Sequence, residues 1–251
     1  MLLALETAND QCSVALWNES GLQAFQHDGR AREQTRVLLP MVEAVLAETG
    51  QTLANLSAIA FSRGPGSFNG IRINAAVAQA LGWAQDIPLI PVSTLEALAR
   101  SVDGVDDRRE GNSTCDGDAT AVQRILAVLD ARMQELYSGF FEQQPNGQWH
   151  AVGAEQLCGY GAIQWPANWD ASTVWTIAGS DCPLTEIPEM LAAPVHTLPN
   201  CLPDARHIAA IGWEMLQQGT VMTAGAALPV YLRDDAWKKK DAQQAAKQSR
   251  P

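Results

Sequence analysis

The sequence predicts a mixed α/β protein with two halves, each built around its own β-sheet. Two observations support this fold class. The first hundred residues read as three antiparallel strands followed by alternating helices and strands. A hairpin pattern also occurs twice, at residues 2–18 and 124–143, and each copy has a β-rich run that ends in an acidic residue, Glu6 or Asp130. The repeated pattern makes an internal duplication a candidate interpretation.

The first half is predicted to continue from its hairpin into a third strand and a helix over residues 33–48. Apolar residues recur in that helix at helical spacing, at Val37, Leu38, Met41, Val42, Val45 and Leu46. The next predicted elements are a strand, a glycine loop, a small-residue helix, a strand and a further helix, at residues 56–62, 63–70, 70–85, 87–92 and from Ser93 onward. Ser93 with Glu96 forms a capping-box pattern.

Three antiparallel strands followed by alternating helix and strand imply a mixed sheet with helices on its faces. This is the ribonuclease H-like order, which actin, sugar kinases and Hsp70 use twice. We therefore expect an N-terminal ribonuclease H-like lobe at residues 1–100 and a smaller, truncated C-terminal lobe with a basic tail at residues 122–251. The polar, glycine-containing segment 101–121 is expected to be a linker or insertion between them.

The charge distribution disfavours the chain as an independent nucleic-acid binder. There are 17 basic and 28 acidic residues, a formal net charge of −11, so the surface as a whole repels a phosphate backbone. Basic residues gather only at the C-terminus, at Arg233, Lys238, Lys239, Lys240, Lys247 and Arg250. A solvated end is the ordinary interpretation of such a tail, and a contact with nucleic acid or a partner is the alternative.

Other composition signals point to a cytoplasmic protein without a membrane segment. No run approaches the roughly 18–20 apolar residues of a membrane span, and the first residues do not resemble a signal peptide. The five cysteines are scattered without a CxxC pair, so neither a disulfide framework nor a zinc site is suggested. The four histidines show no metal-ligand spacing, and we expect no structural metal.

The glycine loop, "RGPGSFNGIR", has the position of a phosphate-binding loop but not its motif. It contains Arg63, Gly64, Pro65, Gly66, Ser67, Asn69, Gly70 and Arg72. A P-loop needs a lysine that is absent here, the GxGxxG spacing fails, and a GxSxG nucleophile elbow fails because Pro65 stands two residues before Ser67. Free N–H groups at a helix start still favour an anion, so an incidental anion site flanked by Arg63 and Arg72 stays an alternative.

The two hairpin turns predict that a nucleotide site is lost. Proteins of the actin and Hsp70 class bind ATP phosphates with glycine-containing turns after the first strand of each lobe. The corresponding turns here, "ETANDQ" and "DARMQE", contain no glycine that would let the backbone approach a phosphate. Glu6 and Asp130 are expected to cap turns or face water, and a metal site formed by them is the alternative.

The glycines of the loop therefore need another explanation, which the helix after the loop supplies. Small residues dominate it, at Gly70, Ala75, Ala76, Ala78, Ala80 and Gly82. Such a helix can approach a neighbouring helix closely. Together with the apolar stripe of the helix at 33–48, it forms a pair that is interpreted either as ordinary core packing or as a docking surface.

The segment "GPGSFNGIRI" resembles the GPGSFTGLRIG signature of the TsaB (YeaZ) family, the dimerisation subunit of the bacterial complex that makes N6-threonylcarbamoyladenosine in tRNA. Five further segments are similar to that family in the same order: "LLALETANDQCSVALWN", "REQTRVLLPMVEAVL", "PVSTLEALA", "LAVLDARMQELYSGFFE" and "PVYLRDDAWKKK". The chain departs from the family at Asn69 for threonine, Asn74 for glycine, Glu6 for aspartate and Gln34 for histidine. Asn74 is expected to place a larger side chain on the small-residue face.

The resemblance implies an ASKHA fold (actin, Hsp70 and sugar-kinase-like) with a degenerate nucleotide site and no cofactor. It implies that catalysis belongs to a paralogous metal-bearing subunit, TsaD, which transfers the threonylcarbamoyl group from its adenylate to adenosine beside the anticodon. A TsaE-type ATPase supports turnover. The present chain would then be a non-catalytic partner subunit that forms a homodimer when alone and meets tRNA mainly through the complex. A contact between tRNA and residues 238–250 stays an alternative.

The resemblance also places the partner interface on the two N-terminal helices. Its expected residues are Val37, Leu38, Met41, Val42, Val45, Ile71, Asn74, Ala75, Ala78 and Leu81. A charge in place of Val42 or Ala78 would then abolish partner binding and leave the chain folded. The alternative function is an ASKHA-type enzyme, a kinase or an M22 glycoprotease-like protein, with its own Mg-ATP or metal site at Glu6 and Asp130.

Overall fold

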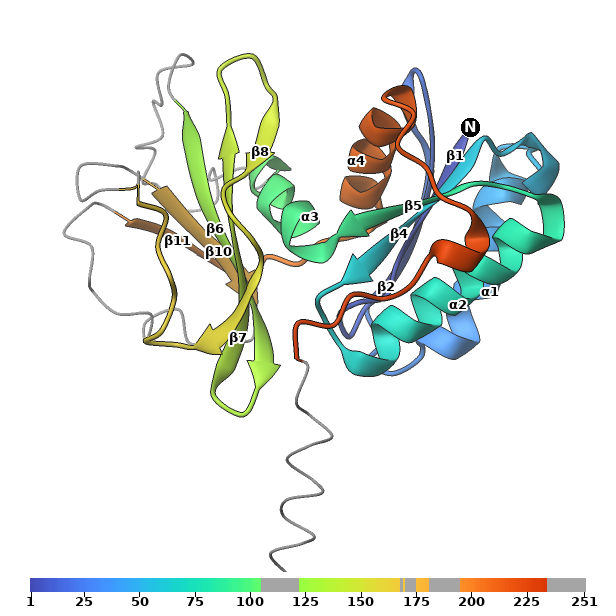
Figure 1. Cartoon of the computed structure of the whole chain (residues 1–251). Helices are drawn as coiled ribbons and strands as arrows, with labels where there is room; N and C mark the ends of the chain where they lie inside the picture. The colour runs from blue at the N-terminus through green and yellow to red at the C-terminus, as the bar shows by residue number, and fades with distance from the viewer. Residues whose placement is uncertain (105–121, 168, 170–174, 181–194, 234–251) are drawn as a thin grey trace, which may run out of the picture.

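The computed structural model describes residues 1–104, 122–167, 169, 175–180 and 195–233. It contains two β-sheets with helices between them and on the outer face of the first sheet (Figure 1). Among the described residues, no helix has the length and apolar character needed to cross a membrane. Most of the expected linker and the basic tail from residue 234 lie outside the described residues.

The first sheet has five strands in the order β3-β2-β1-β4-β5. Strands β1 to β3 pair antiparallel, whereas β4 runs parallel to β1 and β5 runs parallel to β4. The strands are β1 (Leu2–Glu6), β2 (Cys12–Asn18), β3 (Gly21–Asp28), β4 (Ala58–Gly64) and β5 (Leu89–Ser93). The mixed sheet and the ribonuclease H-like order expected from the sequence are confirmed.

Helices α1 (Gln34–Glu48) and α2 (Phe68–Gln85) cover the face of this sheet that is turned away from the second sheet (Figure 1). Their apolar stripes are buried against the strands, as the helical spacing predicts. Helix α2 begins two residues before its expected start. Ser67 is its N-cap, and the side-chain oxygen of Ser67 accepts a hydrogen bond from the N–H of Gly70.

The second sheet contains the second hairpin, β6 (Gln123–Arg132) and β7 (Glu135–Gln143). Its strand order is β11-β10-β6-β7-β8, and β9 also pairs with β7. Strands β10 and β11 extend it in parallel from β6, so it repeats the mixed plan of the first sheet. The remaining strands are β8 (Trp149–Ala151), β9 (Gln156–Gly159), β10 (Trp175–Ser180) and β11 (Val195–Pro199).

One face of the second sheet is covered by tryptophan-rich loops. Trp165 and Trp169 pack on Phe140, and Trp175 of β10 packs on both tryptophans, with ring centroids of these pairs 4.8 to 6.4 Å apart. Large aromatic side chains bury as much area as a short helix face supplies. This explains why the segment shows no helical periodicity in the sequence, although it belongs to a packed core.

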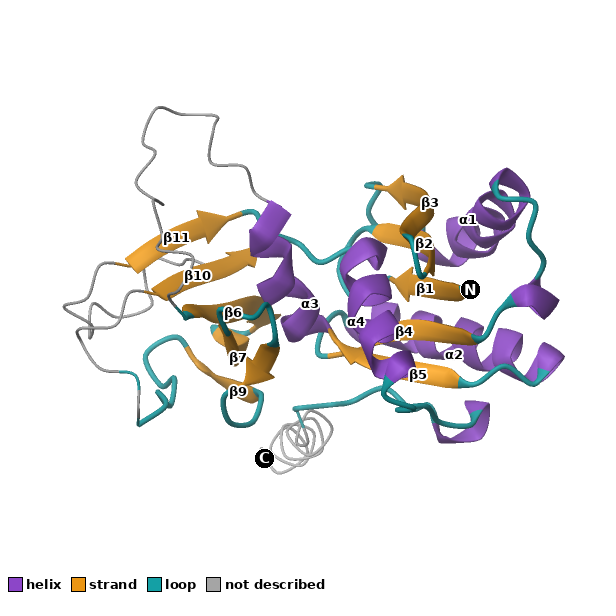
Figure 2. Ribbon diagram, turned by 90° about the horizontal axis from the view of Figure 1, so that it is seen from above, coloured by secondary structure: helices purple, strands orange, loops and turns teal. Residues whose placement is uncertain are grey.

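The two remaining helices correct the expected lobe boundaries. Helix α3 (Thr94–Arg100), expected in the first lobe, packs on the second sheet, and α4 (Ala205–Gln217), expected in the second lobe, packs on the first (Figure 2). Residues 222–230 also return to the first lobe, where Met222 bridges to Leu89. An apolar stripe shows that a helix covers a sheet but not which sheet, so sequence order misassigned both helices.

Candidate functional site

The glycine loop packs against the turn between β1 and β2. A side chain at Gly66 would collide with the carbonyl of Ala8, and one at Gly70 would collide with the carbonyl of Thr7. Gly64 has a positive φ of 104°, which residues with a side chain rarely adopt. The glycines are therefore required by the close approach of two backbone segments within the same chain.

Polar groups of the loop are bonded to that same turn. The N–H of Ser67 donates to the carbonyl of Ala8 at 2.7 Å, and the hydroxyl of Thr7 donates to the carbonyl of Gly70 at 2.8 Å. The N–H of Gly70 is capped by Ser67 at 3.5 Å. Two of the loop N–H groups that a phosphate would need are thus already engaged within the chain.

Arg63, the first of the two arginines that flank the loop, contacts the second lobe. The guanidinium of Arg63 forms an ion pair with Glu155, a residue of the second lobe, at 3.3 Å. The hydroxyl of Ser93, the N-cap of α3, donates to the same carboxylate. Through these two contacts, Glu155 links the second lobe to the glycine loop and to the start of α3. Sequence reasoning missed it, since nothing in its local pattern marks a contact 92 residues away.

Glu6 and Asp130 occupy different environments. Glu6 is 1% exposed and accepts a hydrogen bond from the N–H of Ala8, and its second carboxyl oxygen has no partner. Burial raises the pKa of Glu6 to about 7. Asp130 accepts the N–H of Arg132 at 2.8 Å and pairs with its guanidinium at 3.0 Å, which makes it a turn cap. Within the described residues, no three His, Cys, Asp or Glu side chains are grouped to hold a metal ion.

Asn74 is fully buried and faces the sheet. Its amide nitrogen lies 2.7 Å from the hydroxyl of Ser62 and 3.1 Å from the carbonyl of Leu5. The side chain therefore links α2 to the carboxyl ends of β1 and β4. The expectation that Asn74 enlarges the outward small-residue face is wrong, because the helix turns this position toward its own sheet.

Eight of the ten side chains expected at the partner interface are in the core of the chain. Their exposed fractions do not exceed 9%, at Leu38, Met41, Val42, Val45, Ile71, Asn74, Ala75 and Ala78. Val37 and Leu81 are partly buried and pack on the same core. Side chains buried this deeply leave a partner little surface to touch while α1 and α2 stay packed on the sheet, so the burial speaks against their proposed direct contact. An interface on α1 and α2 stays a prediction, and its contacts would come from other residues.

The outward residues of these helices are different ones. The exposed positions of α2 include Arg72, Ala76, Ala80 and two aromatic residues, Phe68 at 59% and Trp83 at 66% exposure. Leu39 of α1 is 48% exposed. The spacing identified the helical stripe correctly and left core packing and docking open. The family resemblance placed the stripe at a partner interface, whereas the structure turns it toward the sheet.

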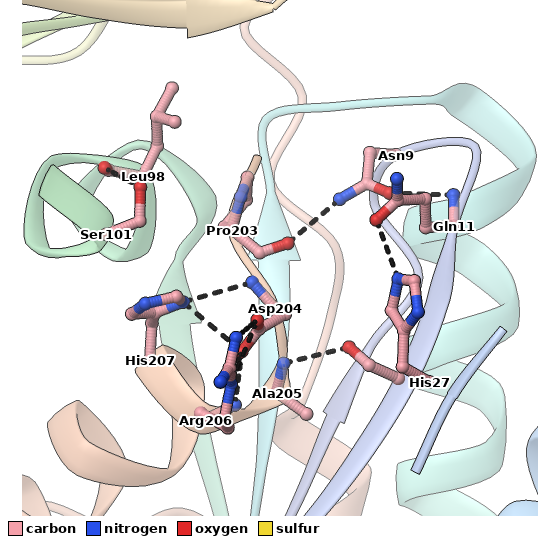
Figure 3. A network of polar contacts seen from close by, with 11 residues as sticks. Asn9, Gln11, His27, Leu98, Ser101, Pro203, Asp204, Ala205, Arg206 and His207 are labelled. Atoms are coloured by element: carbon pink, nitrogen blue, oxygen red, sulfur yellow. Dashed lines mark hydrogen bonds and ion pairs between the residues drawn. The ribbon is translucent and has the colours of Figure 1, made fainter. Parts of the chain in front are cut away.

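A polar network ties the start of α4 to the first hairpin (Figure 3). The amide of Asn9 donates to the carbonyl of Pro203 at 3.1 Å, and the N–H of Ala205 donates to the hydroxyl of Ser13 at 2.8 Å. Asp204 caps α4 and forms an ion pair with Arg206 at 2.6 Å. The network stabilises the segment in which the chain returns from the second sheet to the first. Sequence reasoning missed it because its members lie about 190 residues apart.

Comparison with known proteins identifies the family to which this chain belongs. Residues 29–164 match the family model described as TsaD, tRNA N6-adenosine threonylcarbamoyltransferase. The tRNA threonylcarbamoyladenosine biosynthesis protein TsaB of Escherichia coli is 33% identical over 95% of this chain and 97% of its own length. The chain belongs to the TsaB family. TsaB of Haemophilus influenzae is also 33% identical, over 95% of this chain and 96% of its own.

The solved structure of YeaZ from Pseudomonas aeruginosa shares this two-lobe ASKHA-like fold. It superposes with a TM-score of 0.77 at 33% identity, covering 92% of this chain and 99% of that chain. The family resemblance that the signature segment suggested is therefore confirmed over nearly the whole TsaB-type chain.

The buried carboxyl of Glu6 makes the stability of this TsaB-family chain depend on pH. Between pH 4.5 and about 7 the folded chain keeps a proton that the unfolded chain releases. The free energy of unfolding should therefore fall as pH rises through this range, by about 3 kcal/mol from Glu6 alone. Urea denaturation at both ends of the range should show this decline in the wild type and lose it in Glu6→Gln. An identical decline in both proteins would contradict the assignment.

Proposed function

We propose that this chain is a non-catalytic partner subunit in the formation of N6-threonylcarbamoyladenosine in tRNA, and that it binds and supports a TsaD-type catalytic subunit. Its similarity to TsaB proteins over nearly the full chain supports a role in this pathway. The observation that carries the partner role is the outward face of α2. Residues 73–85 contain no charged side chain, in a protein of net charge −11.

An uncharged, exposed helix face is typical of a protein interface. Charged residues are depleted at interface centres, and aromatic residues are enriched there. The outward side of α2 has Ala76 and Ala80 at its middle and Trp83 near its end, all exposed. The two alanines allow another helix to approach closely, and Trp83 offers a large anchor.

The interior of the chain supports the non-catalytic part of the proposal. The loop that would hold a phosphate is packed on the turn at residues 7–8, and its glycines are used for that contact. Glu6 is buried and is not among the residues that line the cavity between the lobes, and Asp130 is engaged by Arg132. A chain with this arrangement would leave metal and nucleotide chemistry to its partner.

The remaining roles follow from the same proposal. A TsaE-type ATPase would join the complex that the TsaD-type subunit forms with this chain. Contact with tRNA would come mainly from the complex, because the net charge of this chain is unfavourable for a phosphate backbone. When no partner is present, the same α1 and α2 surface would pair two copies of the chain. All of these steps would take place in the cytoplasm, with the tRNA.

A charge on the outward face of α2 should separate partner binding from folding. Ala80→Glu places a long acidic side chain at the exposed middle of the helix, so the free energy of unfolding should change by no more than about 0.5 kcal/mol. Affinity for the TsaD-type subunit, measured by isothermal titration, should fall more than about tenfold. Ala162→Glu, at an exposed position of the second lobe, is the matched control. Equal binding by both variants and the wild type would refute the interface.

A further inference from the structure

Two side chains of α2 and one that is 159 positions away in the sequence form an ordered cluster at the start of α2. The guanidinium carbon of Arg72 lies 3.6 Å from the ring centroid of Phe68, and the Nε of Arg72 donates to the hydroxyl of Tyr231 at 2.7 Å. The two rings are 6.2 Å apart. Phe68 is 59% and Tyr231 41% exposed. We call Phe68, Arg72 and Tyr231 the Arg72 cluster.

Among the described residues, Arg72 differs from most arginines of this acidic protein in having no acidic side chain paired with it. In the part of the chain that the structure describes, only Arg32 and Arg72 among the arginines form no ion pair. Stacking on Phe68 and the bond to Tyr231 fix the position of its guanidinium. The Nε–H is used by Tyr231, which leaves the terminal N–H groups for a planar, bidentate acceptor.

A cavity lined by both apolar and charged residues adjoins the cluster. Phe68 and Tyr231 stand at a cavity of about 430 Å³ between the lobes, whose lining includes Pro65, Ile71 and Leu129. Met133 of the second lobe is 73% exposed, and its sulfur lies 3.7 Å from the guanidinium of Arg233, which lines the cavity. Exposed Phe, Tyr, Met and Arg side chains around one hollow are the composition of an interface centre.

We infer that the Arg72 cluster is a docking site for a carboxylate side chain of a protein partner, with apolar neighbours of that acid seated over Phe68, Tyr231 and the cavity. The occupant follows from charge complementarity, because Arg72 is an ordered cation that forms no ion pair with any described residue. A nucleic-acid phosphate fits less well. A nucleic acid carries a charge on every phosphate and needs several free cations, whereas the nearby charges of Arg132 and Arg233 are already neutralised by Asp130 and Glu135.

This inference rests on the proposed function and names a second part of its interface. The Arg72 cluster lies at the N-terminal end of α2, whereas Ala80 and Trp83 lie toward its other end. A partner that covers α2 over its length would meet both. Because the guanidinium is pre-ordered, little side-chain entropy would be lost when the carboxylate arrives.

The test titrates the purified TsaD-type subunit of the same organism into the full-length chain at low and at high salt. Arg72→Gln should weaken binding about tenfold or more, and added salt should reduce the difference between this variant and the wild type. Arg72→Lys should also weaken binding, since lysine can neither stack on Phe68 nor bind a carboxylate bidentately. Tyr231→Phe should cost about threefold through loss of the anchoring hydroxyl.

Arg206→Gln is the matched control. Arg206 is about half exposed and lies on α4, on the opposite face of the first sheet from α2, so this variant should bind with the affinity of the wild type. Unchanged binding by Arg72→Gln, with the wild type binding tightly, would overturn this inference and leave the proposed function intact. Absence of binding by the wild type would overturn both. If Arg72→Gln instead lowered only the affinity of the chain for tRNA, a protein carboxylate would be the wrong occupant.

Discussion

Val42→Asp is expected to cost the chain about 4 kcal/mol or more of its free energy of unfolding, because it buries an unpaired charge. Val42 is 3% exposed and packs between α1 and the first sheet. A domain of this kind is stabilised by only about 5–15 kcal/mol, so the variant should be largely unfolded or strongly heat-sensitive. Urea denaturation followed by circular dichroism measures the loss.

Leu39→Asp is the control for this experiment. Leu39 lies on the same helix and is 48% exposed, so the same charge there should leave the free energy of unfolding nearly unchanged. If Val42→Asp remained as stable as Leu39→Asp and lost only partner binding, the apolar stripe of α1 would face a partner after all. The burial pattern of this helix would then be incorrect.

Gly70→Ala is expected to destabilise the chain by about 3 kcal/mol, the upper range for overpacking. Gly70 lies inside α2, where helix propensity alone would make alanine more stable by about 1 kcal/mol. The new methyl group would collide with the backbone carbonyl of Thr7, which cannot move without displacing β1. Steric overlap should therefore outweigh helix propensity. Denaturant unfolding without any added ligand measures whether the free energy of unfolding falls or rises.

Gly29→Ala is the comparison, since its added methyl group would meet only a histidine ring carbon at 3.6 Å. It should change the free energy of unfolding by less than about 0.5 kcal/mol. If Gly70→Ala were as stable as Gly29→Ala and differed only in binding an anion, the loop glycines would serve a phosphate instead of the packing described above.

The sequence predicted the strands and helices of the first lobe because their signals are local. Alternating apolar residues predict β2 and β7, the capping pattern at Ser93 predicts the start of α3, and the family signature predicts the glycine loop. Each of these features depends on residues a few positions apart. The fold class followed from their order alone.

The errors concern what each local element packs against. The stripe of α1 was correctly read as apolar, but periodicity does not distinguish a sheet of the same chain from another protein. Asn74 was placed on the small-residue face because it departs from the glycine of the family signature, although its amide binds Ser62 and Leu5 within the sheet. Helix α3 packs on the second sheet and α4 on the first, through contacts that only the tertiary structure reveals.

The residues that sequence analysis missed contact partners far away in the sequence. Glu155 meets Arg63 and Ser93 across the lobe boundary, and Arg72 meets Tyr231 over 159 positions. No short motif marks either pair. Arg72 was singled out as a flank of the glycine loop, where it was weighed as part of an anion site. The structure instead stacks it on an exposed aromatic ring.

The central claim is that this chain supports a catalytic subunit and has no catalytic role of its own. The most direct measurement reconstitutes tRNA modification from purified TsaD-type subunit, TsaE-type ATPase and this chain, omitting one protein at a time, with tRNA and the threonylcarbamoyl adenylate supplied. Formation of the modified nucleoside should require this chain together with the TsaD-type subunit and should be absent with this chain alone. Modified nucleoside formed by this chain without the TsaD-type subunit, or full activity when this chain is omitted, would contradict the account.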